Sequence, residues 1–228
     1  MADTTKDVPA RLSSDTLFKH RNLPEQVADH IVLLLATGEL QPGQRLFEND
    51  LCKQLGVSRV PVREALRLLQ AQGVVKAEPN RGSFMNRFGS EEAKEFLTIR
   101  LSVEQIALKR LARVVKQDPT VLAPLDDIIQ KMRQAHTIKD KLASCQADLA
   151  FHRTLIELSG SPVLLPIWNS ISRGILVYFM QERQAYYDYN RSIADHAVLL
   201  DAIRKSDASE LNAMIEKHIM ATPVPHAE

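Results

Sequence analysis

Residues 56–73, GVSRVPVREALRLLQAQG, decide how the first third of the chain folds. Arg59, Arg63 and Arg67 recur every four residues, so they share one face of a helix, while the leucines of the stretch fall on another face. Ser58 stands where a helix N-cap is expected. A helix with a row of cations on one side and an apolar back is suited to lie against a polyanion.

The segments around this helix complete a small domain. Residues 24–37 show helical periodicity, and residues 48–55 form a second short amphipathic stretch that ends at a glycine. After the basic helix, residues 74–78 and 83–87 alternate in polarity around a Pro-Asn-Arg-Gly turn, which predicts a β-hairpin. Helix, helix, turn, helix and hairpin within about 65 residues is the order of a winged helix-turn-helix.

Beyond residue 89 the pattern is helical throughout, so we expect a mainly α protein in which an all-α bundle of about six helices follows the winged domain. The predicted helices are 90–116, 119–135, 139–159, 162–186, 189–205 and 207–221. The expected division is a flexible tail (1–18), the winged domain (19–88), the bundle (89–222) and a frayed C-terminus (223–228). A bundle of this size can enclose a ligand cavity.

Composition narrows the class of protein. The chain has 228 residues, 45% of them hydrophobic and 25% charged, with a net charge of +1. It contains neither a membrane-length apolar run nor the apolar core of a signal peptide, so a cytoplasmic protein with two reduced, buried cysteines is expected. The charge is uneven, because residues 56–87 hold six cations and two acids.

The basic helix and the hairpin tip are candidates for DNA contact. In a helix-turn-helix the second helix enters the major groove, and its N-terminal side chains reach base edges or phosphates. Ser58, Arg59 and Arg63 occupy that position, and Arg81 and Gly82 form the tip of the wing. The competing interpretation is a solvated helix face on which the arginines pair with acids.

A second constellation lies in the bundle. Asp148 and His152 are four residues apart on one helix, and His196 and His218 fall in the apolar stripes of two others. Three inward histidines with a carboxylate suit a divalent ion such as Zn²⁺, Ni²⁺ or Mn²⁺, and in octahedral geometry they leave coordination positions open. Taken one by one, each histidine could instead be a hydrogen-bonded core residue.

The first of these regions resembles a known family. LQPGQRLFENDLCKQLGVSRVPVREALRLLQAQGVV followed by RGSF is similar to the N-terminal domain of GntR-family transcription regulators over about residues 23–87. Val60 stands where threonine is common, and Asn49 stands where many members carry a DNA-contacting arginine. The resemblance implies operator contact at these positions: Ser58, Arg59, Val60, Arg63, Arg81 and Gly82.

The bundle resembles the FCD effector-binding domain of the FadR-like branch of that family. The matching segments are IRLSVEQIAL, DLAFHRTLIELSGSPVL, DHAVLLDAIRKSD and MIEKHI. The resemblance implies that Asp148, His152, His196 and His218 hold a metal beside which a small carboxylate effector binds, with Arg100 as partner of its carboxylate. Arg173 and Tyr178 are further candidates for the effector cavity, Arg173 being equally suited to the surface or a dimer interface.

These observations predict a homodimeric, ligand-responsive DNA-binding regulator, of the repressor type commoner in the family, that binds a palindromic operator. One alternative is a DNA-binding protein with a purely structural or a sensed metal. Another is a metalloenzyme with an accessory DNA-binding head, which is disfavoured because no acid is placed as a general base. Glu157 follows His152 by five residues and so points elsewhere. We therefore expect no enzymatic activity.

Overall fold

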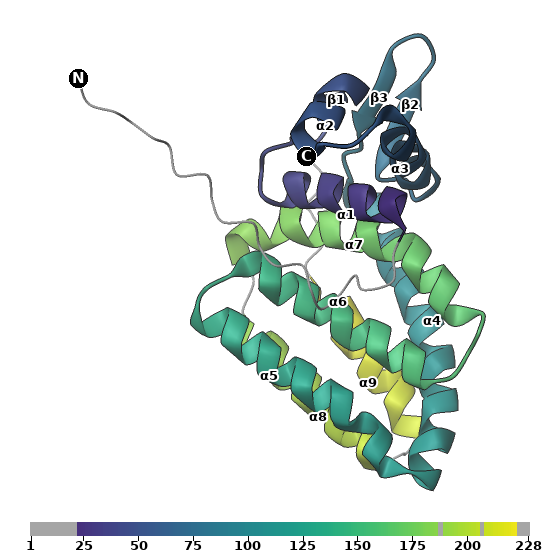
Figure 1. Ribbon diagram of the computed structural model, residues 1–228. Helices are drawn as coiled ribbons and strands as arrows, with labels where there is room; N and C mark the ends of the chain where they lie inside the picture. Colours follow the sequence, from purple (N-terminus) through teal and green to yellow (C-terminus); the bar gives the residue numbers. More distant parts are fainter. Residues whose placement is uncertain (1–21, 187–188, 206–207, 223–228) are drawn as a thin grey trace.

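The computed structural model describes residues 22–186, 189–205 and 208–222 (Figure 1). It confirms a mainly α protein whose only β structure, within the described residues, is a small sheet in the N-terminal part. The predicted tail (1–18) and C-terminus (223–228) lie outside the described residues. We call the part from residue 22 to residue 88 the head and the helices after it the bundle.

The head is a winged helix-turn-helix. Its elements are α1 (Leu23–Ala36), β1 (Arg45–Leu46), α2 (Glu48–Leu55), α3 (Arg59–Ala71), β2 (Val75–Glu78) and β3 (Gly82–Met85). The sheet is antiparallel with the order β1-β3-β2. The sequence predicted the hairpin but not β1, because a two-residue strand is too short to show alternation.

Two local expectations in the head need correction. Ser58 does occupy the N-cap position of α3, but its side chain makes no capping hydrogen bond. The hydroxyl is therefore not committed to the helix end. Cys52 is only half-buried, whereas Cys145 is fully buried, and neither forms a disulfide bond.

Six α-helices follow in the described part of the bundle, as predicted, together with one 3-10 turn. They are α4 (Ser90–Gln117), η1 (Pro119–Leu122), α5 (Ala123–Thr137), α6 (Lys141–Leu158), α7 (Leu164–Tyr186), α8 (Tyr189–Lys205) and α9 (Ala208–Met220). The long helix α4 packs against α6, α7, α8 and α9. None of the described helices is long and apolar enough to cross a membrane.

Helix α7 belongs to both parts of the molecule. Figure 1 shows α1 of the head lying along it, and the two helices are in contact. Val177 is buried in the hydrophobic core of the head, and Leu176 contacts the cores of both parts. Phe96 on α4 also contacts both cores and meets Phe88 edge-on, with ring centroids 5.1 Å apart. The head is therefore seated on the bundle through a continuous apolar contact.

Gly174 allows α4 and α7 to approach closely. A Cβ at this position would lie 2.3 Å from Cζ of Phe96. We expect Gly174→Ala to lower the free energy of unfolding by roughly 1–3 kcal/mol, because the overlap outweighs the better helix propensity of alanine. Urea unfolding followed by circular dichroism measures this, and the double variant Gly174→Ala, Phe96→Leu should regain part of the loss. A single variant as stable as the wild type would contradict the close packing.

Candidate metal centre and nucleic-acid interface

Three imidazole rings converge in the bundle from three helices. His152 lies on α6, His196 on α8 and His218 on α9. The Nε2 atom of His152 is 3.2 Å from Nε2 of His196 and 3.2 Å from Nε2 of His218. One nitrogen from each ring lies within 4.8 Å of the other two. His152 and His196 are fully buried, so the sequence-predicted histidines form one cluster that could hold a metal ion.

Hydrogen bonds occupy the Nδ1 atoms of two of the rings. His196 Nδ1 lies 2.7 Å from the carbonyl oxygen of Ser192, which can only accept, so Nδ1 carries the proton. His152 Nδ1 lies 2.5 Å from Oε2 of Glu104 and forms a hydrogen bond with that carboxyl group. The Nε2 atoms of the two rings lie 3.2 Å apart, and Nε2 of His218 is 3.2 Å from that of His152. An imidazole that carries its proton on Nδ1 offers Nε2 as a metal ligand, and these three Nε2 atoms lie close enough together to bind one ion.

His218 completes the set as a neutral ring. Burial, and next the neighbouring His196 and His152, lower the pKa of His218 well below its usual range. A neutral imidazole is the form that binds a metal ion. Its Nδ1 atom is buried and has no hydrogen-bond partner within the described residues.

Glu104 is a site residue that the sequence analysis missed. Its carboxylate is fully buried on α4, with Oε2 on His152 Nδ1 and Oε1 accepting from Arg100 Nε at 2.9 Å. Burial raises the pKa of the Glu104 carboxyl to about 7, against the opposing effect of Arg100. A carboxylate behind a ligand histidine fixes the tautomer and orientation of the ring. The sequence did contain a feature that could have indicated this role: in the segment IRLSVEQIAL, Glu104 follows Arg100 by one helical turn.

Asp148 lies at the edge of the histidine cluster. Its Oδ1 atom is 3.6 Å from His196 Nε2, and its Oδ2 atom accepts from Arg100 Nη2 at 3.4 Å. The spacing of four residues does place Asp148 and His152 on one side of α6, where both are buried. As a ligand, Asp148 would share its two oxygens between the ion and Arg100.

Arg100 is enclosed by the site. Only 1% of its surface is exposed, and the guanidinium carbon lies 5.9 Å from the ring centre of Trp168 and 5.5 Å from that of Phe179. Its hydrogen bonds to Glu104 and Asp148 use Nε and Nη2, so the guanidinium is the cationic partner of two buried acidic side chains. Tyr178, buried beside Phe179 with ring centroids 5.8 Å apart, keeps its effector role as a prediction.

Arg173 lies at the junction with the head. Its Nε donates to Asp29 Oδ1 at 2.8 Å, and its Nη1 donates to Gln72 Oε1 at 3.0 Å. Gln72 in turn donates to the carbonyl oxygen of Asn169 at 3.3 Å. The side chain therefore links α7 to α1 and to the end of α3, and its contact with an effector stays a prediction.

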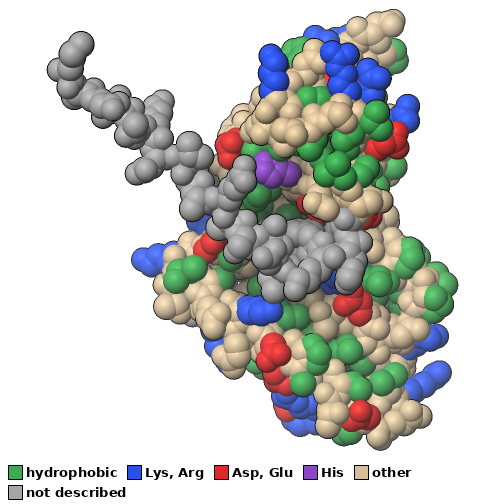
Figure 2. Space-filling model, in the orientation of Figure 1, with side chains coloured by type: hydrophobic (Ala, Val, Ile, Leu, Met, Phe, Trp, Pro, Cys, Tyr) green, Lys and Arg blue, Asp and Glu red, His purple; other side chains and the backbone are tan. Residues whose placement is uncertain are grey.

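The exposed face of the head carries the predicted DNA-contacting residues. Figure 2 shows Lys and Arg side chains at the end of the molecule that the head forms. Arg63 pairs with Glu48 at 2.8 Å and Arg81 with Glu78 at 2.6 Å, whereas Arg59 has no ion pair among the described residues. These pairs are exposed and weak, so a phosphate can replace the acids at little cost.

The wing places a further cation that the sequence analysis missed. Gly82 at the tip has φ +98°, and an added Cβ there would come within 3.4 Å of Arg45 Nε. Arg45 is exposed on β1, with its guanidinium 4.8 Å from the ring centre of Phe47, so it lies beside Gly82 of the wing. Because β1 was not predicted, nothing in the sequence connected Arg45 to the hairpin tip.

Family comparisons agree with both parts of this geometry. Residues 23–85 match the bacterial regulatory proteins of the gntR family, and residues 95–221 match the FCD domain. The chain belongs to the GntR family. This GntR-family protein is a DNA-binding transcriptional regulator and not an enzyme, which confirms two of the sequence-based predictions.

The relatives of this GntR-family regulator include named repressors. It is 26% identical over 187 residues to the gluconate operon transcriptional repressor of Bacillus licheniformis. The aligned region covers 80% of this chain and 76% of the relative. It is 31% identical over 192 residues to an uncharacterized HTH-type transcriptional regulator of Streptomyces ambofaciens. The aligned region covers 82% of this chain and 78% of that relative.

Solved structures show the same fold. E. coli McbR/YncC superposes with a TM-score of 0.76 at 23% identity, over 88% of this GntR-family chain and 95% of that one. A GntR regulator from Rhodococcus sp. RHA1 gives a TM-score of 0.72 at 23% identity, over 86% and 93%. At this level of identity the likeness establishes the arrangement of the helices alone.

Proposed function

We propose that this regulator is a repressor that senses a small organic acid through a divalent metal ion held in its bundle. His152, His196 and His218 would hold the ion, with Asp148 as a fourth ligand. The convergence of the three ring nitrogens, with Nε2 of His152 3.2 Å from Nε2 of His196 and of His218, is the observation that carries the proposal. The buried Glu104 behind His152 is the second support, since it orients the ring for a metal.

The ion would supply a Lewis-acidic site for a carboxylate of the effector. Arg100 offers the cation beside that position, and its fork suits the planar geometry of a carboxylate. An imidazole set that leaves coordination positions open distinguishes a ligand-binding ion from a closed structural one. Zn²⁺, Ni²⁺ and Mn²⁺ all suit the donor set.

Native mass spectrometry of the protein as purified tests the metal. We expect one divalent ion per chain in the wild type, and occupancy at least about tenfold lower in His218→Ala, because one of three nitrogen ligands is gone. His30→Ala, on the exposed side of α1, is the matched control and should keep the ion. An ion-free wild type that also takes up no Zn²⁺, Ni²⁺ or Mn²⁺ would refute the metal half of the proposal.

A second candidate is a purely structural or sensed metal. It is favoured by the position of Asp148, whose Oδ1 atom lies 3.6 Å from His196 Nε2 and could close a tetrahedral site with the three histidines. The same mass spectra separate the two candidates. A small acid retained together with the ion supports the sensor. An ion without a retained acid, in a protein whose operator affinity does not change when acids are added, supports the alternative.

On the DNA side, the regulator would act as a homodimer. Two α3 helices would then read half-sites about one helical turn apart on a palindromic operator. Ser58, Arg59, Arg63, Arg81 and Gly82 would make the contacts. Val60, which is 70% exposed at the start of α3, presents an apolar surface suited to a thymine methyl group.

Arg59 should be the clearest of these contacts, because no ion pair within the described residues competes for it. We expect Arg59→Ala to weaken operator binding by about 1–3 kcal/mol, or roughly 5- to 150-fold, if the guanidinium forks onto a guanine. Fluorescence anisotropy on an operator selected from random duplex DNA measures the loss. Arg133→Ala, exposed on α5, is the control, and equal affinities for the two variants would remove Arg59 from the interface.

A further inference from the structure

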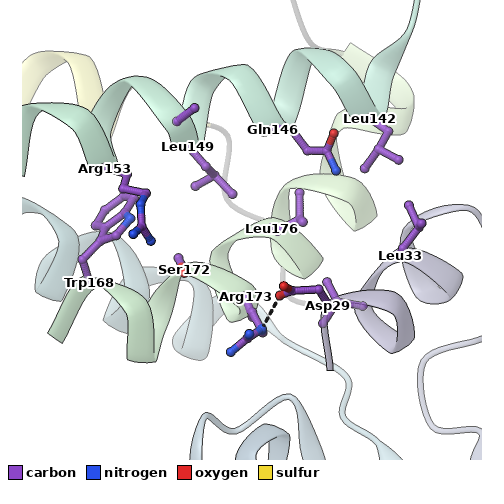
Figure 3. Close-up of a pocket in the computed structure, with 12 residues that line it drawn as sticks. Asp29, Leu33, Leu142, Gln146, Leu149, Arg153, Trp168, Ser172, Arg173 and Leu176 are labelled. Carbon is purple, nitrogen blue, oxygen red and sulfur yellow. Dashed lines mark hydrogen bonds and ion pairs between the residues drawn. The ribbon is translucent and has the colours of Figure 1, made fainter. Parts of the chain in front are cut away.

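A pocket lies at the junction between the head and the bundle, separate from the histidine cluster (Figure 3). It has a volume of about 100 Å³, is partly open to solvent and is bounded by α1, α6 and α7. The residues used in the argument are Asp29, Leu33, Leu149, Trp168, Ser172 and Arg173. A molecule in this pocket would contact the DNA-binding head and the effector bundle at the same time.

The pocket and the histidine cluster lie on opposite sides of the same residues of α6 and α7, and the three histidines do not line the pocket. Helix α6 turns Leu149 toward the pocket and its neighbour Asp148 toward the histidines. Trp168 stands between the two sites, since it lines the pocket and its ring centre is 6.4 Å from that of His152.

The chemistry of the lining favours an apolar body with a negative charge. Seven of the twelve lining residues are apolar, and two are arginines, Arg153 and Arg173. Arg153 is bonded to Glu157 and Asn169, and Figure 3 shows the Arg173 guanidinium on the side toward α1, bonded to Asp29. Arg173 is 8% exposed, and its bonds to Asp29 and Gln72 use only Nε and Nη1. A guanidinium carries five N–H donors, so a carboxylate can bind the remaining ones.

We propose that this junction pocket binds a small aromatic or short-chain carboxylate, with the hydrocarbon against Leu149 and Trp168 and the carboxylate on Arg173. The ligand would share the Arg173 guanidinium with Asp29 and so act on the contact between α7 and the head. This site needs no metal ion, and it therefore goes beyond the effector site proposed above.

Trp168 is the only tryptophan of the chain, so its fluorescence reports on the pocket directly. The experiment titrates benzoate into the full-length protein after removal of metals with EDTA, and benzamide serves as the uncharged isostere. We expect a saturable change in emission with benzoate and at least tenfold weaker binding of benzamide. The absence of a saturable change, or equal binding of the two compounds, would overturn the proposal.

Variants locate the binding. Ser172→Phe fills the pocket from α7 and Leu33→Phe fills it from α1, so both should abolish the benzoate response. Ser170→Phe places the same ring on the exposed side of α7 and should bind like the wild type. His218→Ala should also bind normally, because it alters only the histidine cluster. A benzoate response that survives in a folded Ser172→Phe variant, or that His218→Ala removes, would overturn the proposal and place the ligand at the histidine cluster.

The two proposals can fail separately. Benzoate binding is measured on metal-free protein, whereas the metal proposal rests on the ion content of the protein as purified. A protein that binds benzoate but no metal keeps the junction pocket, and a metal-loaded protein without a benzoate response keeps only the bundle site.

Discussion

Replacing Glu104 with alanine is expected to lower the free energy of unfolding by about 3–5 kcal/mol, because the change breaks a buried, hydrogen-bonded charge pair. The Glu104 carboxyl group is fully buried, accepts a hydrogen bond from Arg100 Nε and shares another with His152 Nδ1. Without it the buried guanidinium keeps only the longer bond to Asp148 at 3.4 Å, and His152 loses the hydrogen-bond partner that orients its ring. Urea unfolding of the metal-free protein, followed by circular dichroism, measures the loss.

Two variants make this result specific to the site. Glu95→Ala, exposed on the same helix, should change stability by less than about 0.5 kcal/mol. Glu104→Gln keeps the size of the side chain but not its charge, and we expect it to weaken Zn²⁺ binding about 10- to 100-fold. Equal stability of Glu104→Ala and Glu95→Ala would show that the carboxylate is not part of the buried network.

The elements that the sequence predicted well are those with local signals. The basic helix has its own N-cap residue, a proline in the first turn and an apolar back, and none of these depends on distant contacts. The inward histidines followed from helical periodicity in the same way, since a residue within an apolar stripe of a bundle helix faces the core. Both inferences concern the side of a helix on which a residue lies, and the 3.6-residue period of the α-helix determines that side from the sequence alone.

What the sequence could not show depends on contacts between distant segments. In the sequence, Glu104 is one charged residue among many in its helix. Only the packing of α4 against α6 shows that it forms a hydrogen bond with His152, 48 residues away. Arg173 reads as a helix cation, and its bonds to Asp29 and Gln72 span more than 100 residues. The strand β1 is formed by its pairing with β3, because two residues carry no pattern of their own.

Helix α7 provides a structural route by which a change in the bundle would affect the position of the head. Trp168 and Arg173 lie on the same helix, the first beside His152 and Arg100, the second bonded to α1. Helix α7 supplies core residues to both parts. A shift of α7 would therefore move the head, but a ligand causes such a shift only if it binds the two arrangements with different affinity.

Arg100→Lys is expected to remove the response of operator binding to the effector while leaving the affinity of the effector-free protein unchanged. Lysine keeps a cation near Glu104 and Asp148, so the buried carboxylates retain a partner, but it lacks the planar fork that binds a second carboxylate side-on. Citrate, lactate and gluconate are suitable probes, each added to the metal-loaded protein. Fluorescence anisotropy then gives the operator affinity with and without each acid.

In the wild type, a coupling of about 1–3 kcal/mol would make the two affinities differ by roughly 5- to 150-fold for the acid that fits. In Arg100→Lys this ratio should fall to about 1, and Arg113→Lys, exposed on the same helix, should keep the wild-type ratio. If Arg100→Lys responds like the wild type, Arg100 acts only as the internal partner of Glu104 and Asp148. If its effector-free operator affinity also falls, the guanidinium supports the position of α7 itself, and the bundle couples to the head through the charge network rather than through the ligand.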